Sequence, residues 1–150
     1  MKRAVVVGGG TWGTSFSRLL VDRGFDVTLA VRDAEVARTI TETGRNPHYS
    51  SSVDLNGIAA TTIADAPVDK TDLVVVAVPS SSFGSVVAGL TGSAPVLSLT
   101  KGLDPATGER LSTTPRKARL GTATTTRSAL ATGASAIVAA AIPFRSTLLE

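Results

Sequence analysis

Three glycines near the amino terminus have the spacing of a dinucleotide-binding turn. Gly8, Gly10 and Gly13 form the pattern Gly-x-Gly-x-x-Gly directly after the β-branched run at residues 5–7. In such a turn the first glycine allows a tight bend, the second lets the backbone approach a pyrophosphate, and the third lets the next helix pack close to the sheet. N–H groups at the helix N-terminus then face the phosphates. A purely structural strand–turn–helix is the alternative, and the flanking strand and helix patterns favour nucleotide binding.

Two charged residues, Arg32 and Asp33, follow the next strand-like run at residues 26–31. Asp33 lies 20 residues after Gly13, where a dinucleotide-binding unit places an acidic group for the ribose 2′-hydroxyl, while an Arg accommodates a 2′-phosphate. Arg32 favours NADPH over NADH as the cofactor, against the alternative of a solvated surface side chain. Asp33 is equally well explained as a ribose ligand or as the N-cap of a helix beginning at Ala34.

Two later strand-like runs end in residues that could face the same crevice. One run closes with Pro79 and a serine turn, and the other is followed by Lys101. Ligands of doubly wound sheets bind outside the carboxyl ends of the strands, so a Lys ammonium there could hold an anionic substrate or polarise an oxygen. A solvated strand end is the alternative. Tyr49 could contact the cofactor or merely close its loop on the sheet. His48 has no second metal-binding side chain at a suitable spacing, so no metal site is expected.

Five apolar runs predict the strands that position these residues. Four are expected to be buried, at residues 3–8, 26–31, 72–78 and 95–99, and a shorter one lies at 58–62. Continuous apolar runs are typical of parallel strands that are covered on both faces. The connections are long enough for crossovers, so every strand is expected to be parallel. The predicted fold class is α/β, a doubly wound parallel sheet of the Rossmann-like type with an atypical C-terminal tail.

Two helices are predicted from the periodicity of their apolar residues. The first follows the glycine turn and stops at Gly24. Its expected core face consists of four apolar residues, Phe16, Leu19, Leu20 and Val21. The second follows Pro79, and its expected core residues are Phe83, Val86, Val87 and Leu90.

Length, composition and charge limit the classes of protein to which the chain can belong. The chain has 150 residues, enough for one domain, and no cysteine, which excludes disulfides and is compatible with a reducing cytoplasm. Neither a signal sequence nor a long apolar span is recognisable, so we expect a soluble, cytoplasmic protein. Residues 1–112 carry ten Lys and Arg against eleven Asp and Glu, whereas residues 113–150 carry five against one. The basicity belongs to the tail, and few aromatics interleave with it, so no nucleic-acid partner is expected.

Five motifs, taken in order, resemble bacterial NAD(P)-dependent glycerol-3-phosphate dehydrogenase. They are residues 8–14 (Gly-Gly-Gly-Thr-Trp-Gly-Thr), 32–33 (Arg-Asp), 46–49 (Asn-Pro-His-Tyr), 76–80 (Val-Ala-Val-Pro-Ser) and 98–102 (Ser-Leu-Thr-Lys-Gly). The resemblance implies hydride transfer between NAD(P)H and the C2 position that links glycerone phosphate and sn-glycerol 3-phosphate, at the entrance to phospholipid synthesis. By matching motif, Thr11, Trp12, Arg32 and Tyr49 would contact the cofactor, and Lys101 would contact both cofactor and substrate.

The resemblance covers roughly residues 1–112, which we expect to form the dinucleotide-binding domain. In this family the chain continues to an all-helical domain that holds the catalytic Lys and the substrate phosphate site, and the sequence contains no counterpart. Residues 113–150 form a tail rich in Thr, Ala and Arg, either helical or disordered. We hypothesise that the chain or its reading frame is interrupted near Ser112, so that no catalytic residue is expected here and the isolated chain is inactive. The alternative is a non-catalytic nucleotide-binding module or an inactive gene product.

Overall fold

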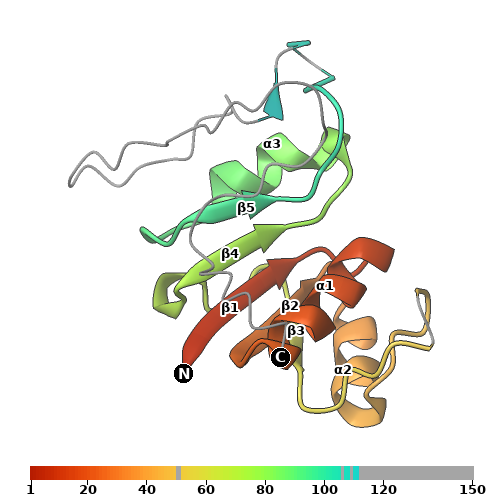
Figure 1. Cartoon of the computed structure of the whole chain (residues 1–150). Coiled ribbons are helices and arrows are strands. Elements are labelled where there is room, and N and C mark those ends of the chain that lie inside the picture. Colours follow the sequence, from red (N-terminus) through yellow and green to blue (C-terminus); the bar gives the residue numbers. More distant parts are fainter. Residues whose placement is uncertain (50–51, 106, 109, 112–150) are drawn as a thin grey trace, which may run out of the picture.

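A single parallel sheet organises the chain. The computed structural model describes residues 1–49, 52–105, 107–108 and 110–111, so the predictions for residues 113–150 lie outside the described residues. The sheet has five strands in the order β3-β2-β1-β4-β5 (Figure 1), and their bounds are β1 (Lys2–Val7), β2 (Phe25–Val31), β3 (Ala59–Thr62), β4 (Leu73–Val76) and β5 (Val96–Ser98). All neighbouring strands pair in parallel. The predicted doubly wound α/β sheet is therefore confirmed.

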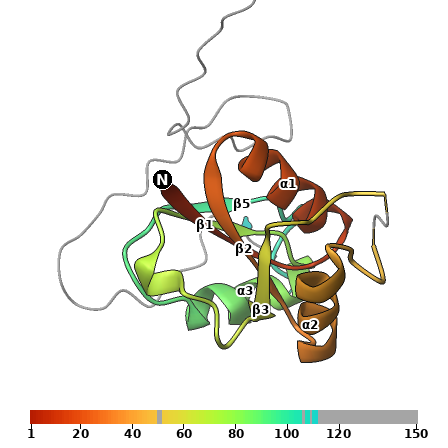
Figure 2. The same ribbon diagram turned by 90° about the horizontal axis from the view of Figure 1, so that it is seen from below.

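Helices cover both faces of this sheet. They are α1 (Thr11–Asp22), α2 (Ala34–Thr43) and α3 (Ser80–Gly89), with a short 3₁₀ turn η1 (Val68–Lys70) before β4. Figure 2 shows α1 and α3 on opposite sides of the strands. After β3 the chain crosses to the other side of β1, so the strand order reverses between β1 and β4. In open α/β sheets the ligand crevice lies outside the carboxyl ends of the strands at such a reversal.

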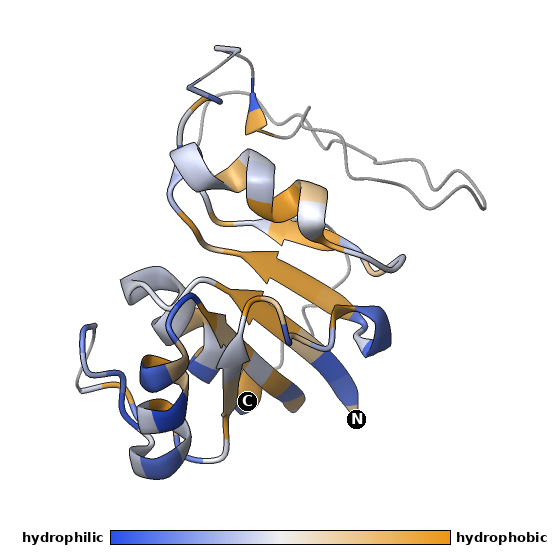
Figure 3. Ribbon diagram, turned by 180° about the vertical axis from the view of Figure 1, so that it is seen from behind, coloured by the Kyte–Doolittle hydropathy of each residue, from blue (hydrophilic) through white to orange (hydrophobic). Residues whose placement is uncertain are grey.

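The core consists of two apolar layers that alternate along β1. Ala4 and Val6 pack toward the side of α1 and α2, and Val5 and Val7 pack toward α3. All four are at most 1% exposed, as strands covered on both faces require. In Figure 3, β4 and β1 are hydrophobic except at the N-terminal end of β1, and α2 carries hydrophilic residues on its outer side. The strands whose carboxyl ends carry the site loops are therefore packed on both faces.

The prediction for α3 is confirmed in its main contacts. Phe83, Val87 and Leu90 are buried against the sheet, and Val86 is partly buried beside them. The helix begins directly after Pro79, which adopts φ −56° and ψ 149°. The proline therefore sets the point at which the chain turns from the carboxyl edge of the sheet into α3.

The predicted core face of α1 is wrong at Leu19, which is 45% exposed. The buried residues of α1 are Gly13, Thr14, Ser17 and Leu20. An added Cβ on Gly13 would lie 1.8 Å from the carbonyl oxygen of Gly8, so the helix starts too close to the turn for large side chains. Small residues therefore occupy the inner face at the start of the helix, and the large side chain of Leu20 is buried only in its last turn. Leu19 lies outside this buried face, although its periodicity predicted it there. The helix ends at Asp22, and Gly24 at φ 81° lets the chain turn back, as predicted.

Candidate functional site

The glycine turn lies across the carboxyl edge of the sheet. Gly8 has φ 114°, and a Cβ on it would lie 2.4 Å from the carbonyl oxygen of Ala77, just beyond β4. Its N–H donates a hydrogen bond to the carbonyl of Ala30 in β2 at 2.8 Å. Only glycine combines this positive φ with such close backbone packing. The tight bend predicted for Gly8 is therefore present and is fixed from both neighbouring strands.

Gly10 occupies the position where the turn opens to solvent. It is the N-cap of α1, with no side-chain cap, and no heavy atom lies within 4 Å of the position that a Cβ would take. The first bond of the helix runs from Thr14 N–H to the Gly10 carbonyl at 2.9 Å, so the three preceding N–H groups have no partner within the helix. The first turn carries no acidic residue. Open space, helix N–H groups and the positive end of the helix dipole together suit a phosphate group.

Asn46 connects the loop after α2 to this turn. The sequence analysis included it in the motif at residues 46–49 but assigned it no role of its own. It is 1% exposed, and its Nδ2 donates to the Gly9 carbonyl at 2.8 Å and to Thr14 Oγ1 at 3.0 Å. Its Oδ1 accepts hydrogen bonds from the backbone N–H groups of His48 at 3.1 Å and Tyr49 at 3.3 Å. The sequence signal is an Asn before Pro, since Asn side chains accept from backbone N–H groups two residues on. That signal predicts a turn, but not its anchor on the glycines.

Trp12 and Lys101 are brought together above the same edge. The Lys101 Nζ lies 5.6 Å from the centroid of the Trp12 ring, within the range of a cation–π interaction. Trp12 is 64% exposed, so its ring stands out from the first turn of α1. The hydroxyl of Thr100 donates to the Val78 carbonyl at 2.8 Å and ties the end of β5 to the segment that precedes Pro79. Residues that lie far apart in the sequence thus meet at one edge, as predicted from the strand ends.

Asp33 caps α2, which was one of its two sequence interpretations. Its side chain accepts a hydrogen bond from the Glu35 N–H at 2.8 Å, with extended backbone at φ −103°. Arg32 is exposed at the end of β2, beside the point where the glycine turn packs on Val31. The roles of Arg32 and Asp33 toward a cofactor stay predictions.

The Tyr49 loop presents an aromatic surface without a metal site. Tyr49 is 49% exposed and contacts the His48 ring edge-on, with centroids 6.4 Å apart. In the part of the chain that the structure describes, no group of three or more His, Asp or Glu side chains could hold a metal ion. The hydrogen bonds from Asn46 to both backbone N–H groups account for the local geometry of this loop.

Surface ion pairs lie on the exposed faces of α1 and α2. The hydrogen bond and charge of Asp22 raise the pKa of Arg18 above its usual value, and those of Glu35 raise the pKa of Arg38. Exposed pairs within one helix contribute little to stability because water and salt screen them. Their effect is to keep the outer surfaces of these helices polar.

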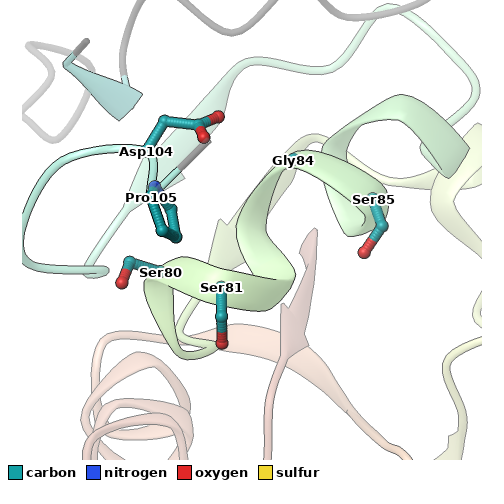
Figure 4. A pocket seen from close by; sticks show the side chains of 6 residues that line it. All are labelled: Ser80, Ser81, Gly84, Ser85, Asp104 and Pro105. Atoms are coloured by element: carbon teal, nitrogen blue, oxygen red, sulfur yellow. The ribbon is translucent and has the colours of Figure 1, made fainter. Parts of the chain in front are cut away.

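A separate hollow of about 450 Å³ lies between α3 and the segment after β5. Its lining residues are Ser80, Ser81, Gly84, Ser85, Asp104 and Pro105. In Figure 4 the serine side chains do not point toward Asp104, so the polar groups do not converge on one point. None of the glycine-turn residues lines it. The glycine turn is therefore the stronger candidate site.

Among the described residues, no helix has both the length and the apolar character needed to span a membrane.

Sequence comparisons identify a family that this chain resembles over most of its length. The family model described as NAD-dependent glycerol-3-phosphate dehydrogenase N-terminus matches residues 3–137, which extends beyond residue 112. Glycerol-3-phosphate dehydrogenase [NAD(P)+] of Nocardia farcinica is 40% identical over 124 residues, covering 75% of this chain and 36% of that protein. The Corynebacterium urealyticum enzyme of the same name is 36% identical over 117 residues, covering 75% and 35%. The chain thus spans about a third of the length of these relatives.

Solved structures share the fold. The glycerol-3-phosphate dehydrogenase of Coxiella burnetii superposes with a TM-score of 0.62 at 22% identity, covering 70% of this chain and 34% of that one. A ketopantoate reductase of Ralstonia eutropha gives a TM-score of 0.54 at 28% identity, covering 67% and 34%. Enzymes named for different substrates therefore share this sheet, and the sequence match carries the family assignment. With 135 of its residues inside the family model, the chain belongs to the family of NAD-dependent glycerol-3-phosphate dehydrogenase N-terminal domains.

Proposed function

We propose that this chain binds NAD(P)H, with NADPH favoured, across the carboxyl edge of its sheet. The observation that carries the proposal is Gly10, where open space adjoins the helix N–H groups that precede the first α1 hydrogen bond. A pyrophosphate placed there receives backbone hydrogen bonds and the field of the helix without a cationic side chain. Gly8 and Gly13 support the site by close packing of the turn.

The flanking residues extend the proposed site in two directions. On the adenosine side, Arg32 pairs with the 2′-phosphate of NADPH and Asp33 lies at the ribose. Thr11, Trp12, Tyr49 and Pro79 provide further contacts to the cofactor beyond the adenosine. The exposed Trp12 ring and the exposed Tyr49 ring are apolar surfaces that a bound ligand would cover.

The reaction we assign to the complete protein is that of glycerol-3-phosphate dehydrogenase, in glycerophospholipid synthesis. When bound, NAD(P)H would supply a hydride to C2 of glycerone phosphate, and NAD(P)+ would accept one from C2 of sn-glycerol 3-phosphate in the reverse direction. Lys101 contacts cofactor and substrate, since its ammonium stands at the same edge as Trp12 and attracts a phosphate ester. We assign no side chain of this chain as the catalytic acid or base. The role that we assign to residues 1–112 is therefore cofactor binding alone.

The proposal also covers the cellular location and the partners of the protein. We place the protein in the cytoplasm, which suits a cysteine-free chain, and assign it no nucleic-acid partner. Residues 113–150 are basic in composition, with five Lys and Arg against one Asp or Glu. With only the cofactor half of the site, we expect the 150-residue chain to be inactive in hydride transfer.

Trp12 allows a direct test, because it is the single tryptophan of the chain and stands at the proposed site. Titration with NADPH is expected to quench its fluorescence in a saturable manner, and NADH is expected to bind more weakly. Reduced nicotinamide mononucleotide carries the same absorbing dihydronicotinamide ring but lacks the pyrophosphate and the adenosine. It therefore controls for absorption by the ligand and should not saturate at the same concentrations. Absence of saturable binding of either dinucleotide, checked by equilibrium dialysis, would refute the proposal.

A further inference from the structure

We propose that Asn46 is a positioning residue of the dinucleotide site, which fixes the Gly9–Gly10 peptide so that the Gly10 N–H points outward to the phosphates. The inference rests on the proposed function and deepens it. It assigns a role to a buried side chain that does not itself touch the ligand. It also explains why the loop that carries Tyr49 is anchored on the glycine turn.

The carbonyl of Gly9 is held by two donors. Asn46 Nδ2 donates to it at 2.8 Å, and the hydroxyl of Thr14 donates to it at 3.3 Å. A second bond of 3.0 Å runs from Asn46 Nδ2 to Thr14 Oγ1, so the two side chains also hold each other. Both are at most 1% exposed. The Gly9 carbonyl is thus directed toward the protein interior by a closed set of buried contacts.

Planarity of the peptide transfers this orientation to Gly10. In a trans peptide the carbonyl of one residue and the N–H of the next point in opposite directions, and the Gly9–Gly10 bond is trans. With the Gly9 carbonyl directed at Asn46, the Gly10 N–H points away from the interior. Gly10 is open on its Cβ side, with no heavy atom within 4 Å. The N–H is therefore available to an anion in front of the turn.

An external anchor is needed because three consecutive glycines form the turn. Residues 8–10 are all glycine, and glycine adopts both signs of φ at little cost, so a peptide between glycines reverses easily. A reversed Gly9–Gly10 peptide would turn a carbonyl oxygen toward the phosphates and repel them. The hydrogen bonds from Asn46 and Thr14 oppose this reversal.

A carboxamide suits this position because it must donate and accept in opposite directions. Asn46 donates through Nδ2 to the glycine turn and accepts through Oδ1 from the N–H groups of His48 and Tyr49. A carboxylate keeps the acceptors but cannot donate to Gly9, and an alanine keeps neither. Asn46→Asp and Asn46→Ala share one loss, the donor to Gly9. Only Asn46→Asp also adds a negative charge.

The test compares both substitutions with matched controls in the 150-residue chain. Asn56→Asp and Asn56→Ala make the same changes at an exposed position of the same connection between α2 and β3. Trp12 fluorescence measures the affinity for NADPH, and NMR titration measures the affinity for adenosine 2′-phosphate, which lacks the pyrophosphate. Thermal unfolding reports whether each variant folds.

Both Asn46 variants are expected to bind NADPH about tenfold or more weakly, the order of one hydrogen bond to a charged group. Their affinity for adenosine 2′-phosphate should stay within about twofold of wild type, because that ligand does not reach the turn. Equal losses for the two ligands would show a general structural role and overturn the proposal. Unchanged NADPH affinity in either variant would also overturn it, and a loss only in Asn46→Asp would indicate charge repulsion.

Two further measurements keep the test decisive. If neither Asn46 variant folds, Thr14→Val removes the second donor to Gly9, and it must lower NADPH affinity selectively or the proposal fails. If the wild-type chain binds no dinucleotide, the proposed function fails by itself. In that case ¹⁵N spectra of the ligand-free chain still decide the positioning role, because Asn46→Ala must shift the Gly10 amide resonance far more than Asn56→Ala does. A Gly10 resonance unmoved by Asn46→Ala would overturn it.

Discussion

Replacement of Gly10 by valine should abolish dinucleotide binding and leave the fold intact. Gly10 adopts φ −71° and ψ −178°, a conformation open to any residue, and no heavy atom lies within 4 Å of its Cβ position. Valine therefore meets no protein atom. Its methyl groups would instead fill the space in front of the first turn of α1, where we place the pyrophosphate.

The size of the effect follows from the contacts that would be lost. A hydrogen bond from an N–H group to a charged partner contributes about 1.5–3 kcal/mol. Displacing the pyrophosphate from two such groups costs about 3–6 kcal/mol, which corresponds to a loss of affinity of about 100-fold or more. Folding should change far less, because valine is a poorer N-cap than glycine by about 1 kcal/mol.

Gly89→Val is the matched control, since Gly89 also has no heavy atom within 4 Å of its Cβ position and lies at the end of α3. NADPH titration by Trp12 fluorescence should show lost binding in Gly10→Val and wild-type binding in Gly89→Val. Urea unfolding of both variants checks the fold. Wild-type affinity in a folded Gly10→Val variant would remove the glycine turn from the site.

Three further predictions follow from the same geometry. Arg32→Ala should weaken NADPH binding more than NADH binding, because only NADPH offers a 2′-phosphate to the guanidinium; equal losses in parallel titrations would make Arg32 a general surface contact. Gly13→Ala should lower the free energy of unfolding by about 3 kcal/mol, since its Cβ would lie 1.8 Å from the Gly8 carbonyl oxygen. In urea titrations the Gly89→Ala control should stay close to wild type, and a Gly13→Ala variant as stable as that control would contradict the close packing. The purified 150-residue chain should show no oxidation of NADPH with glycerone phosphate, measured by nicotinamide absorbance; sustained substrate-dependent oxidation would direct the search for a catalytic group to Lys101.

The strands could be predicted because their signal is local. The apolar runs at residues 26–31 and 72–78 correspond to β2 (Phe25–Val31) and β4 (Leu73–Val76), and continuous burial on both faces leaves such runs in the sequence. The glycine spacing is also local, since Gly13 packs on the Gly8 carbonyl within the motif itself, whereas the close approach of Gly8 to Ala77 depends on the sheet. Motif and structure therefore agree on this part of the candidate site.

Features set by contacts distant in sequence were not predictable in the same way. Asn46 reaches Gly9 across 37 residues, and nothing in the local pattern specifies that partner. Leu19 has the period of a core residue, but the buried face of α1 runs through Gly13, Thr14, Ser17 and Leu20 and leaves Leu19 exposed. The contact of Lys101 with the Trp12 ring depends on the order of β1, β4 and β5 in the sheet. The strand ends predicted a shared edge without predicting which side chains meet there.

Dinucleotide binding at the glycine turn is tested most directly by adding NADPH to the ¹⁵N-labelled chain and following the backbone amide resonances. Binding as proposed would shift the signals of Gly10, Thr11 and Trp12 together, in a saturable manner that gives one dissociation constant. Resonances that remain unmoved, or shifts centred on Ser81 and Asp104 at the separate hollow, would contradict the proposed site.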